Sequence, residues 1–294
     1  MLAALGSDEQ EGWIASLVAS ADPDQAIKAL GQLHEAGVDL ASVADDLAWR
    51  EALVNVVGMS TALADHLVRH PESVRQLRNV SAVAPTARDR RVRLLSAVGA
   101  DPRDARPRAS GPDATEALRI AYRDELLTTV VRDLVHGARV DDVAEELADL
   151  ADAALDAGLA IARSELPDDA PDCRFAVIAM GKCGGRELNY VSDVDVIFVA
   201  EPEEGQDEEA ALRTAQRLAT GVMRACGQAT SEGALWQVDA AAVGFKLSQN
   251  KLEQTGFATA IGANETDLVT LMNGERGVLE ENFCSASERD IIKR

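Results

Sequence analysis

The stretch FAVIAMGKCGGRELNYVSDVDVIFV, residues 175–199, carries the pattern that decides the fold. Residues 175–180 are apolar and partly β-branched and end at a glycine, which predicts a buried strand. A glycine-rich loop and a turn of helix follow, and 193–199 predicts a second buried strand. Farther along, 207–227 has helical apolar spacing and 235–239 is a candidate third strand. This order of strands and helices predicts an α+β fold.

Two aspartates lie at the start of the second predicted strand. Asp193 and Asp195 are two residues apart, so on a strand both side chains point to one face while Val194 points into the core. Neighbouring carboxylates repel one another unless a cation lies between them, and oxygen ligands favour Mg²⁺ or Mn²⁺. Asp239 on the third predicted strand is positioned to complete the site. Three carboxylates that hold metal ions suit phosphoryl or nucleotidyl transfer, so these aspartates are the candidate metal ligands and catalytic residues.

The glycine loop adds candidate nucleotide- and phosphate-binding groups. Gly181, Gly184 and Gly185 connect a strand to a helix start, where backbone N–H groups can bind a phosphate. Lys182 adds a positive charge in the same loop, and Ser192 directly precedes the aspartate pair. Ordinary turn chemistry and an exposed lysine are the alternative interpretation. An Asp-x-Asp pair alone is common, and the signal is its combination with this loop and a downstream aspartate.

The composition excludes several function classes. The 294 residues, a length typical of two domains, include 29 Lys and Arg against 50 Asp and Glu, a net charge of −21. This acidity argues against a partner that is a nucleic acid or an anionic membrane. The 47% hydrophobic content is too high for a disordered chain. We find neither a signal-peptide pattern nor an apolar run near the ~20 residues of a membrane span, and we expect a cytoplasmic protein.

Upstream of the strands, apolar spacing is helical almost throughout. We expect an N-terminal helical region over 1–80 and an irregular, solvated linker over 81–112, where prolines are frequent. Two long helices over 113–170 are expected to pack on the catalytic domain, which covers 171–242. Three charged residues on the first of these helices are expected to be solvated: Arg123, Asp124 and Glu125.

Cysteines and histidines give little sign of a metal site. The cysteines form no C-x-x-C pair, so we expect reduced and mostly buried thiols. His66 and His70 lie four residues apart on a predicted helix, a spacing that can hold a metal ion. No third ligand accompanies them in an H-E-x-x-H-like pattern, so surface or capping roles are expected. The cysteines are Cys173, Cys183, Cys226 and Cys284.

The run over 178–200 closely resembles the bacterial bifunctional glutamine synthetase adenylyltransferase/adenylyl-removing enzymes, in their actinobacterial form. The resemblance extends to 118–127 and 236–241 and covers about 8–242, the N-terminal adenylyl-removing portion of that family. It implies a polymerase-beta-type nucleotidyltransferase palm with Mg²⁺ or Mn²⁺. The residues that match the family's metal carboxylates and phosphate-side loop are Asp193, Asp195, Asp239, Gly181, Lys182, Gly184 and Gly185.

The resemblance also implies a reaction and partners. The removing domain of the family phosphorolyses the AMP–tyrosyl bond on glutamine synthetase and releases ADP. Glutamine synthetase, phosphate and nucleotide are therefore expected partners, together with a nitrogen regulatory signalling protein. The second, ATP-dependent adenylyltransferase domain is expected to be missing, because chains of this family are far longer.

The sequence departs from the family after Ala241. The family continues with a Leu-Arg-Pro strand, whereas this chain continues with Ala242-Val-Gly-Phe. We therefore expect a truncated palm and an unplaced tail over 243–294 that is foreign to the family. Two alternatives remain open: an inactive remnant that only binds glutamine synthetase or a nitrogen regulatory protein, and a free-standing nucleotidyltransferase that acts on a small molecule.

Overall fold

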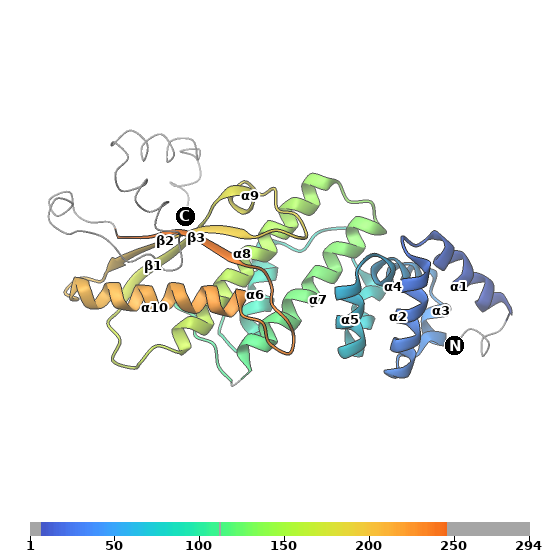
Figure 1. Ribbon diagram of the computed structural model, residues 1–294, viewed down its shortest axis with the longest axis horizontal. Coiled ribbons are helices and arrows are strands. Elements are labelled where there is room, and N and C mark those ends of the chain that lie inside the picture. The colour runs from blue at the N-terminus through green and yellow to red at the C-terminus, as the bar shows by residue number, and fades with distance from the viewer. Residues whose placement is uncertain (1–6, 112, 246–294) are drawn as a thin grey trace.

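The computed structural model describes residues 7–111 and 113–245, which form a mostly helical body with a small sheet toward one end (Figure 1). The predicted α+β class is confirmed. The N-terminal helices lie at the opposite end from the sheet (Figure 1). They are α1 (Ser7–Ala19), α2 (Pro23–Glu35), α3 (Leu40–Ala44), α4 (Leu47–Met59), α5 (Thr61–Arg69) and the 3-10 helix η2 (Pro71–Asn79).

Short polar side chains begin several of these helices. Asp22 accepts a hydrogen bond from the N–H of Gln25, and Asp46 does the same for Trp49. Each cap satisfies a backbone donor that the first helical turn leaves without a partner. The apolar faces of the helices then share one core. Its fully buried members include Trp13, Leu30, Leu33, Leu53, Val56 and Leu67.

The irregular linker predicted for 81–112 is wrong at its centre, where helix α6 (Ala87–Ala97) lies. Thr86 and Asp89 form a capping box, in which each side chain accepts the backbone N–H of the other residue. Leu94 is fully buried in a core shared with the two long helices that follow. The prolines stand outside α6, and the helix ends just before Gly99, which has φ +72°.

Three long helices connect the helical body to the sheet: α7 (Ala114–Leu134), α8 (Val140–Ser164) and α10 (Glu208–Gly227). Helices α8 and α10 pack against each other at very close range. A Cβ on Gly221 of α10 would lie 2.5 Å from the Cβ of Ala162 on α8. The contact therefore has no room for one more methyl group.

The sheet has the order β1-β2-β3, with β1 antiparallel and β3 parallel to the central β2. One face of the sheet shares an apolar core with α8 and α10. Side chains on the other face of β1 and β2 are exposed or half-buried. The bounds are β1 (Cys173–Ala179), the short helix α9 (Gly181–Gly184), β2 (Val194–Pro202) and β3 (Val238–Phe245).

The expectation that three consecutive charges on α7 are solvated is wrong. Glu125 is only 7% exposed and accepts a hydrogen bond of 2.8 Å from Arg93. Asp124 accepts a hydrogen bond from a histidine of α5, and Arg123 donates to the carbonyl of Ala234. Because α7 lies between α5, α6 and the loop before β3, charges on several of its sides meet partners instead of water.

A buried ionic network joins α6, α7 and α8. Arg90 is fully buried and donates to Glu146 at 2.7 Å and to Thr129 at 2.9 Å. Its second carboxylate partner is Glu125, at 3.5 Å. Arg132 donates to the second oxygen of Glu146 at 2.8 Å. Each buried charge thus has an opposite charge, which offsets the cost of removing it from water.

Three of the four cysteines lie in the described part of the chain, and all three are free and buried, as predicted. Cys284 lies outside the described residues. Strand β3 runs through 243–245, and the rest of the predicted tail, 246–294, also lies outside them. Within the described ranges, no helix combines the length and the apolar character needed to cross a membrane.

Candidate active site on the open sheet face

The sheet places two of the three predicted aspartates side by side. Asp195 of β2 and Asp239 of β3 are register partners across the parallel pair. Register partners on adjacent strands are about 4.8 Å apart and point to the same face. Val194 and Val196 are fully buried, so Asp195 points to the open face, as the period of two predicted.

The first glycine of the loop lies directly against Asp195. Gly181 has φ +53°, and a Cβ on it would lie 2.5 Å from the carboxylate oxygen Oδ2 of Asp195. The N–H of Met180 donates to the backbone carbonyl of Asp195 at 2.8 Å, which holds this turn over the strand. Only glycine combines the left-handed backbone with this close approach. The start of α9 therefore fixes where the Asp195 carboxylate can lie.

We expect Gly181→Ala to weaken Mn²⁺ binding at least about tenfold, a loss of about 1.4 kcal/mol, because the added methyl must displace the Asp195 carboxylate. The measurement is a Mn²⁺ titration followed by electron paramagnetic resonance. Gly137→Ala is the matched control, since Gly137 has φ +63° and nothing within 4 Å of the added Cβ. Equal Mn²⁺ affinity in the two variants would contradict the assignment.

The other two glycines shape the turn. A Cβ on Gly184 would overlap the carbonyl oxygen of Ala179, so this position also needs glycine. The N–H of Gly185 donates to the carbonyl of Gly181 at 2.9 Å, which commits that donor to the turn itself. Lys182 lies in the same turn and is exposed.

Local hydrogen bonds orient the remaining carboxylates. Ser192 donates to Asp193 at 3.4 Å just before β2 begins, and Gln237 donates to Asp239 at 2.9 Å. Within the described ranges, the three aspartates do not form a group whose ligand atoms all lie within 4.8 Å of one another. The structure therefore brings Asp195 and Asp239 together and leaves Asp193 at the edge of the pair.

This donor set fits Mg²⁺ or Mn²⁺. Both ions prefer oxygen ligands and keep several waters, so one or two carboxylates on an open face suffice. Asp195 is exposed and Asp239 is half-buried, so solvent and a phosphate can reach both. Cys183, the sulfur nearest in sequence, is buried, and burial raises the pKa of its thiol to about 12. The thiol stays protonated at neutral pH and is neither a soft ligand nor a nucleophile.

Arginines of α7 hold the loop that leads to Asp239. Arg119 is fully buried and donates to the carbonyls of Gly233, at 2.6 Å, and Gln228. Arg123 donates to the carbonyl of Ala234 at 3.2 Å. This loop is partly exposed, and the hydrogen-bond partners of these backbone carbonyls come from one helix face. These arginines fix the path of the chain into β3.

These positioning residues were not among the predicted site residues. The indole N–H of Trp236 donates to the hydroxyl of Tyr122 at 3.2 Å, and burial raises the pKa of Tyr122 to about 12. The signal was available: Arg119, Tyr122 and Arg123 recur at intervals of three and four residues, which place them on one helix face. The spacing does not reveal that this helix face contacts a loop more than 100 residues farther along the chain.

Comparison with known proteins gives consistent matches. Residues 50–241 match the family described as "Glutamate-ammonia ligase adenylyltransferase". A "Bifunctional glutamine synthetase adenylyltransferase/adenylyl-removing enzyme" of Streptomyces avermitilis is 45% identical over 240 residues, which cover 76% of this chain and 22% of that protein. The protein of the same name from Streptomyces coelicolor is 43% identical over 243 residues, with coverage of 76% and 22%.

A third relative with this name, from Cutibacterium acnes, is 39% identical over 237 residues, which cover 78% of this chain and 24% of that protein. The chain thus spans less than a quarter of the length of these relatives. The similarity includes the glycine loop, β2 and the start of β3, since the family match ends at residue 241.

Proposed function

The chain belongs to the glutamate-ammonia ligase adenylyltransferase family, and from that premise we propose that its open sheet face is a metal-dependent nucleotidyltransferase centre of the polymerase-beta type. The observation that carries the proposal is the register pairing of Asp195 with Asp239, with Gly181 packed against the Asp195 carboxylate. In this proposal the reaction is phosphorolytic removal of AMP from adenylylated glutamine synthetase.

Each residue has a role in that reaction. Inorganic phosphate attacks the phosphorus of the AMP group, the bond from phosphorus to the tyrosine oxygen breaks, and that oxygen takes the proton that phosphate gives up. ADP and the free tyrosine hydroxyl result. Asp195 and Asp239 would hold the cation together with Asp193, while Lys182 and Ser192 bind and orient the phosphate groups. Mg²⁺ or Mn²⁺ bound there would neutralise charge on the transferred phosphoryl group.

The surroundings of the site support a protein substrate. Ile178, Met180 and Val191 precede Asp193 in the chain and are 39%, 36% and 94% exposed. Exposed apolar residues near a polar centre are compatible with a surface that contacts another protein. The net charge of −21 disfavours a nucleic acid here despite the polymerase-like arrangement.

A second candidate function is docking without catalysis. The same exposed apolar residues would support it, with glutamine synthetase or a nitrogen regulatory protein as the partner, and it needs no metal. The two candidates differ in one measurable quantity, the phosphate-dependent release of ADP.

The deciding experiment incubates the chain with adenylylated glutamine synthetase, phosphate and Mg²⁺ and measures ADP by chromatography, with a pull-down in parallel. We expect ADP that depends on phosphate, disappears in EDTA and returns with Mg²⁺ or Mn²⁺. Binding without ADP would favour the docking function. Release of ADP that EDTA leaves unchanged would overturn the metal-dependent proposal.

A further inference from the structure

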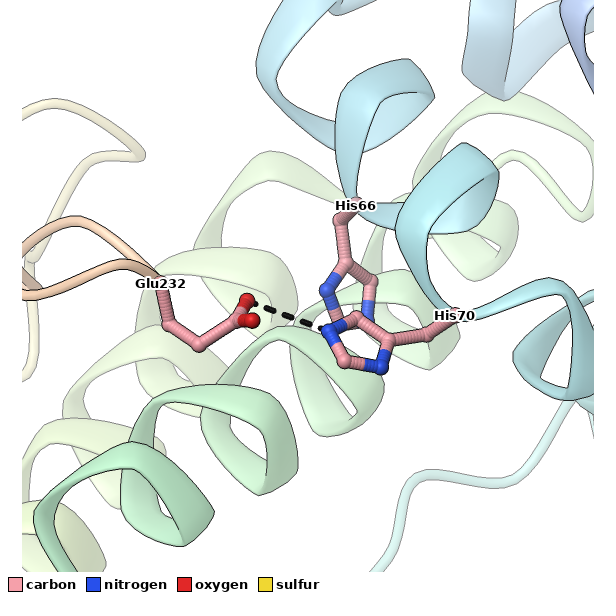
Figure 2. Close-up of side chains that lie close together, drawn as sticks. All are labelled: His66, His70 and Glu232. Atoms are coloured by element: carbon pink, nitrogen blue, oxygen red, sulfur yellow. Dashed lines mark hydrogen bonds and ion pairs between the residues drawn. The ribbon is translucent and has the colours of Figure 1, made fainter.

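Two histidines of α5 meet a glutamate from the loop before β3. His66, His70 and Glu232 each offer one ligand atom, and these atoms all lie within 4.8 Å of one another. Figure 2 shows the three side chains converging, with Glu232 reaching across from its loop to the two histidines. His66 is fully buried, and the side chains of His70 and Glu232 are 16% and 13% exposed. The sequence indicated only His66 and His70 as a possible ligand pair, because Glu232 is far from them along the chain.

The hydrogen bonding of His66 leaves one ring nitrogen without a partner. Its Nε2 lies 2.9 Å from Oδ1 of Asp124, and a carboxylate can only accept, so Nε2 carries the proton. The other nitrogen, Nδ1, is buried and has no hydrogen-bond partner among the described residues. In Figure 2 the His66 ring nitrogen bonded to Cγ lies on the side that faces Glu232. A histidine held at one nitrogen by a carboxylate, with the other nitrogen bare, is arranged as a metal ligand.

The other two ligands are already close. Nε2 of His70 lies 3.1 Å from Oε2 of Glu232. Ligand atoms of a tetrahedral zinc site are separated by about 3.4 Å, as follows from zinc–ligand bonds of about 2.1 Å. A hydrogen bond of this length between the two residues therefore needs little movement to become a shared metal site. Arg69 competes for the same carboxylate, since its NH1 donates to Oε2 of Glu232 at 2.9 Å and also to the carbonyl of Ser231.

Charged side chains of both signs surround the cluster. Arg69 and Arg123 face Glu232. Asp124 holds His66, and Glu72 lies 3.7 Å from Nδ1 of His70. Glu232 itself adds a third carboxylate. Three carboxylates against two arginines leave the cluster one negative charge with neutral histidines, which favours a cation.

We propose that His66, His70 and Glu232 bind one first-row divalent transition-metal ion of the Zn²⁺ type, which ties α5 to the loop that leads to Asp239. Two nitrogens and one oxygen suit Zn²⁺, whereas the all-oxygen set on the sheet suits Mg²⁺. The two sites therefore select different ions. The bound ion would add a fixed link between the N-terminal helices and the loop before β3.

The test uses the full chain, purified without a histidine tag, stripped with a chelator and titrated with Zn²⁺ by calorimetry and with Co²⁺ by visible absorption. We expect one equivalent of Zn²⁺, tetrahedral Co²⁺ bands and a higher melting temperature with Zn²⁺. His70→Gln and Glu232→Gln should each weaken binding at least about 100-fold, because each removes one of three protein ligands. His34→Gln, at an exposed histidine that is not part of the cluster, should bind as the unaltered chain does.

A further variant tests the site without removing a ligand, in case the ligand variants fail to fold. Asp124→Asn keeps all three ligands, and we expect binding to weaken about 10- to 100-fold, as for other carboxylates that orient a metal-bound histidine. Absence of the Co²⁺ bands from the unaltered chain, or full binding by His70→Gln, would overturn the proposal. Asp195→Asn should leave the Zn²⁺ titration unchanged. The zinc proposal can therefore succeed or fail independently of the nucleotidyltransferase proposal.

Discussion

Replacing Asp195 with asparagine is expected to lower phosphate-dependent ADP release at least about a thousandfold, which corresponds to about 4 kcal/mol of lost transition-state stabilisation. Asp195 is the register partner of Asp239, and its carboxylate packs against Gly181. Asparagine keeps the shape of the side chain and removes the charge, so a bound cation would lose one of its two paired carboxylates. The measurement is the initial rate of ADP formation from adenylylated glutamine synthetase at saturating phosphate.

A matched control tests whether the loss of any one negative charge lowers the rate. Asp169→Asn removes one negative charge from an exposed position outside the site, and its rate should equal that of the unaltered chain. Far-ultraviolet circular dichroism should be the same for both variants. An Asp195→Asn rate within a factor of two of the control would show that the aspartate pair is not the catalytic centre.

Arg90→Met is expected to lower the free energy of unfolding by about 3–5 kcal/mol, the largest stability effect we expect of a single side chain in this protein. Methionine has similar length and is apolar, so the change removes the charge while the space stays filled. Glu146 keeps Arg132, but the carboxylates around the vacated position lose a buried partner at 2.7 Å. Urea unfolding followed by circular dichroism measures the difference.

The control for this variant is the substitution of a solvent-exposed arginine. Arg103→Met removes a side chain that is 91% exposed and paired with Asp101 at the surface. Exposed ion pairs contribute only about 0–1 kcal/mol, so the urea midpoint should barely change. Equal midpoints for the two variants would show that the network around Arg90 does not hold α6, α7 and α8 together.

Local patterns were enough to predict the central part of the sheet. The apolar run before Gly181 and the alternation around Asp195 gave β1, β2 and the face of the aspartate, because side-chain direction on a strand depends only on parity. The third strand was predicted at 235–239 and begins at Val238. The difference arises because the Trp236 indole is held by a side chain of α7, which no local pattern reveals.

Long-range contacts explain the remaining errors. Helix α6 was hidden because prolines and charges dominate 81–112, and the burial of Arg90 depends on carboxylates 35 and 56 residues away. The cluster at His70 escaped notice because Glu232 is 162 residues farther along the chain. Charged side chains are assigned to solvent by default in a sequence, and only the fold shows which of them face one another.

The arginine-held loop has a consequence for how the protein folds. Arg119 reaches Gly233 across 114 residues of sequence, and Arg69 reaches Ser231 across 162. Contacts between residues so far apart in sequence form slowly, because a long loop of chain must close before they stabilise the protein. During synthesis α5 and α7 leave the ribosome more than 100 residues before Asp239. We therefore expect the aspartate pair to be assembled late in folding, after the helices that hold its loop have been made.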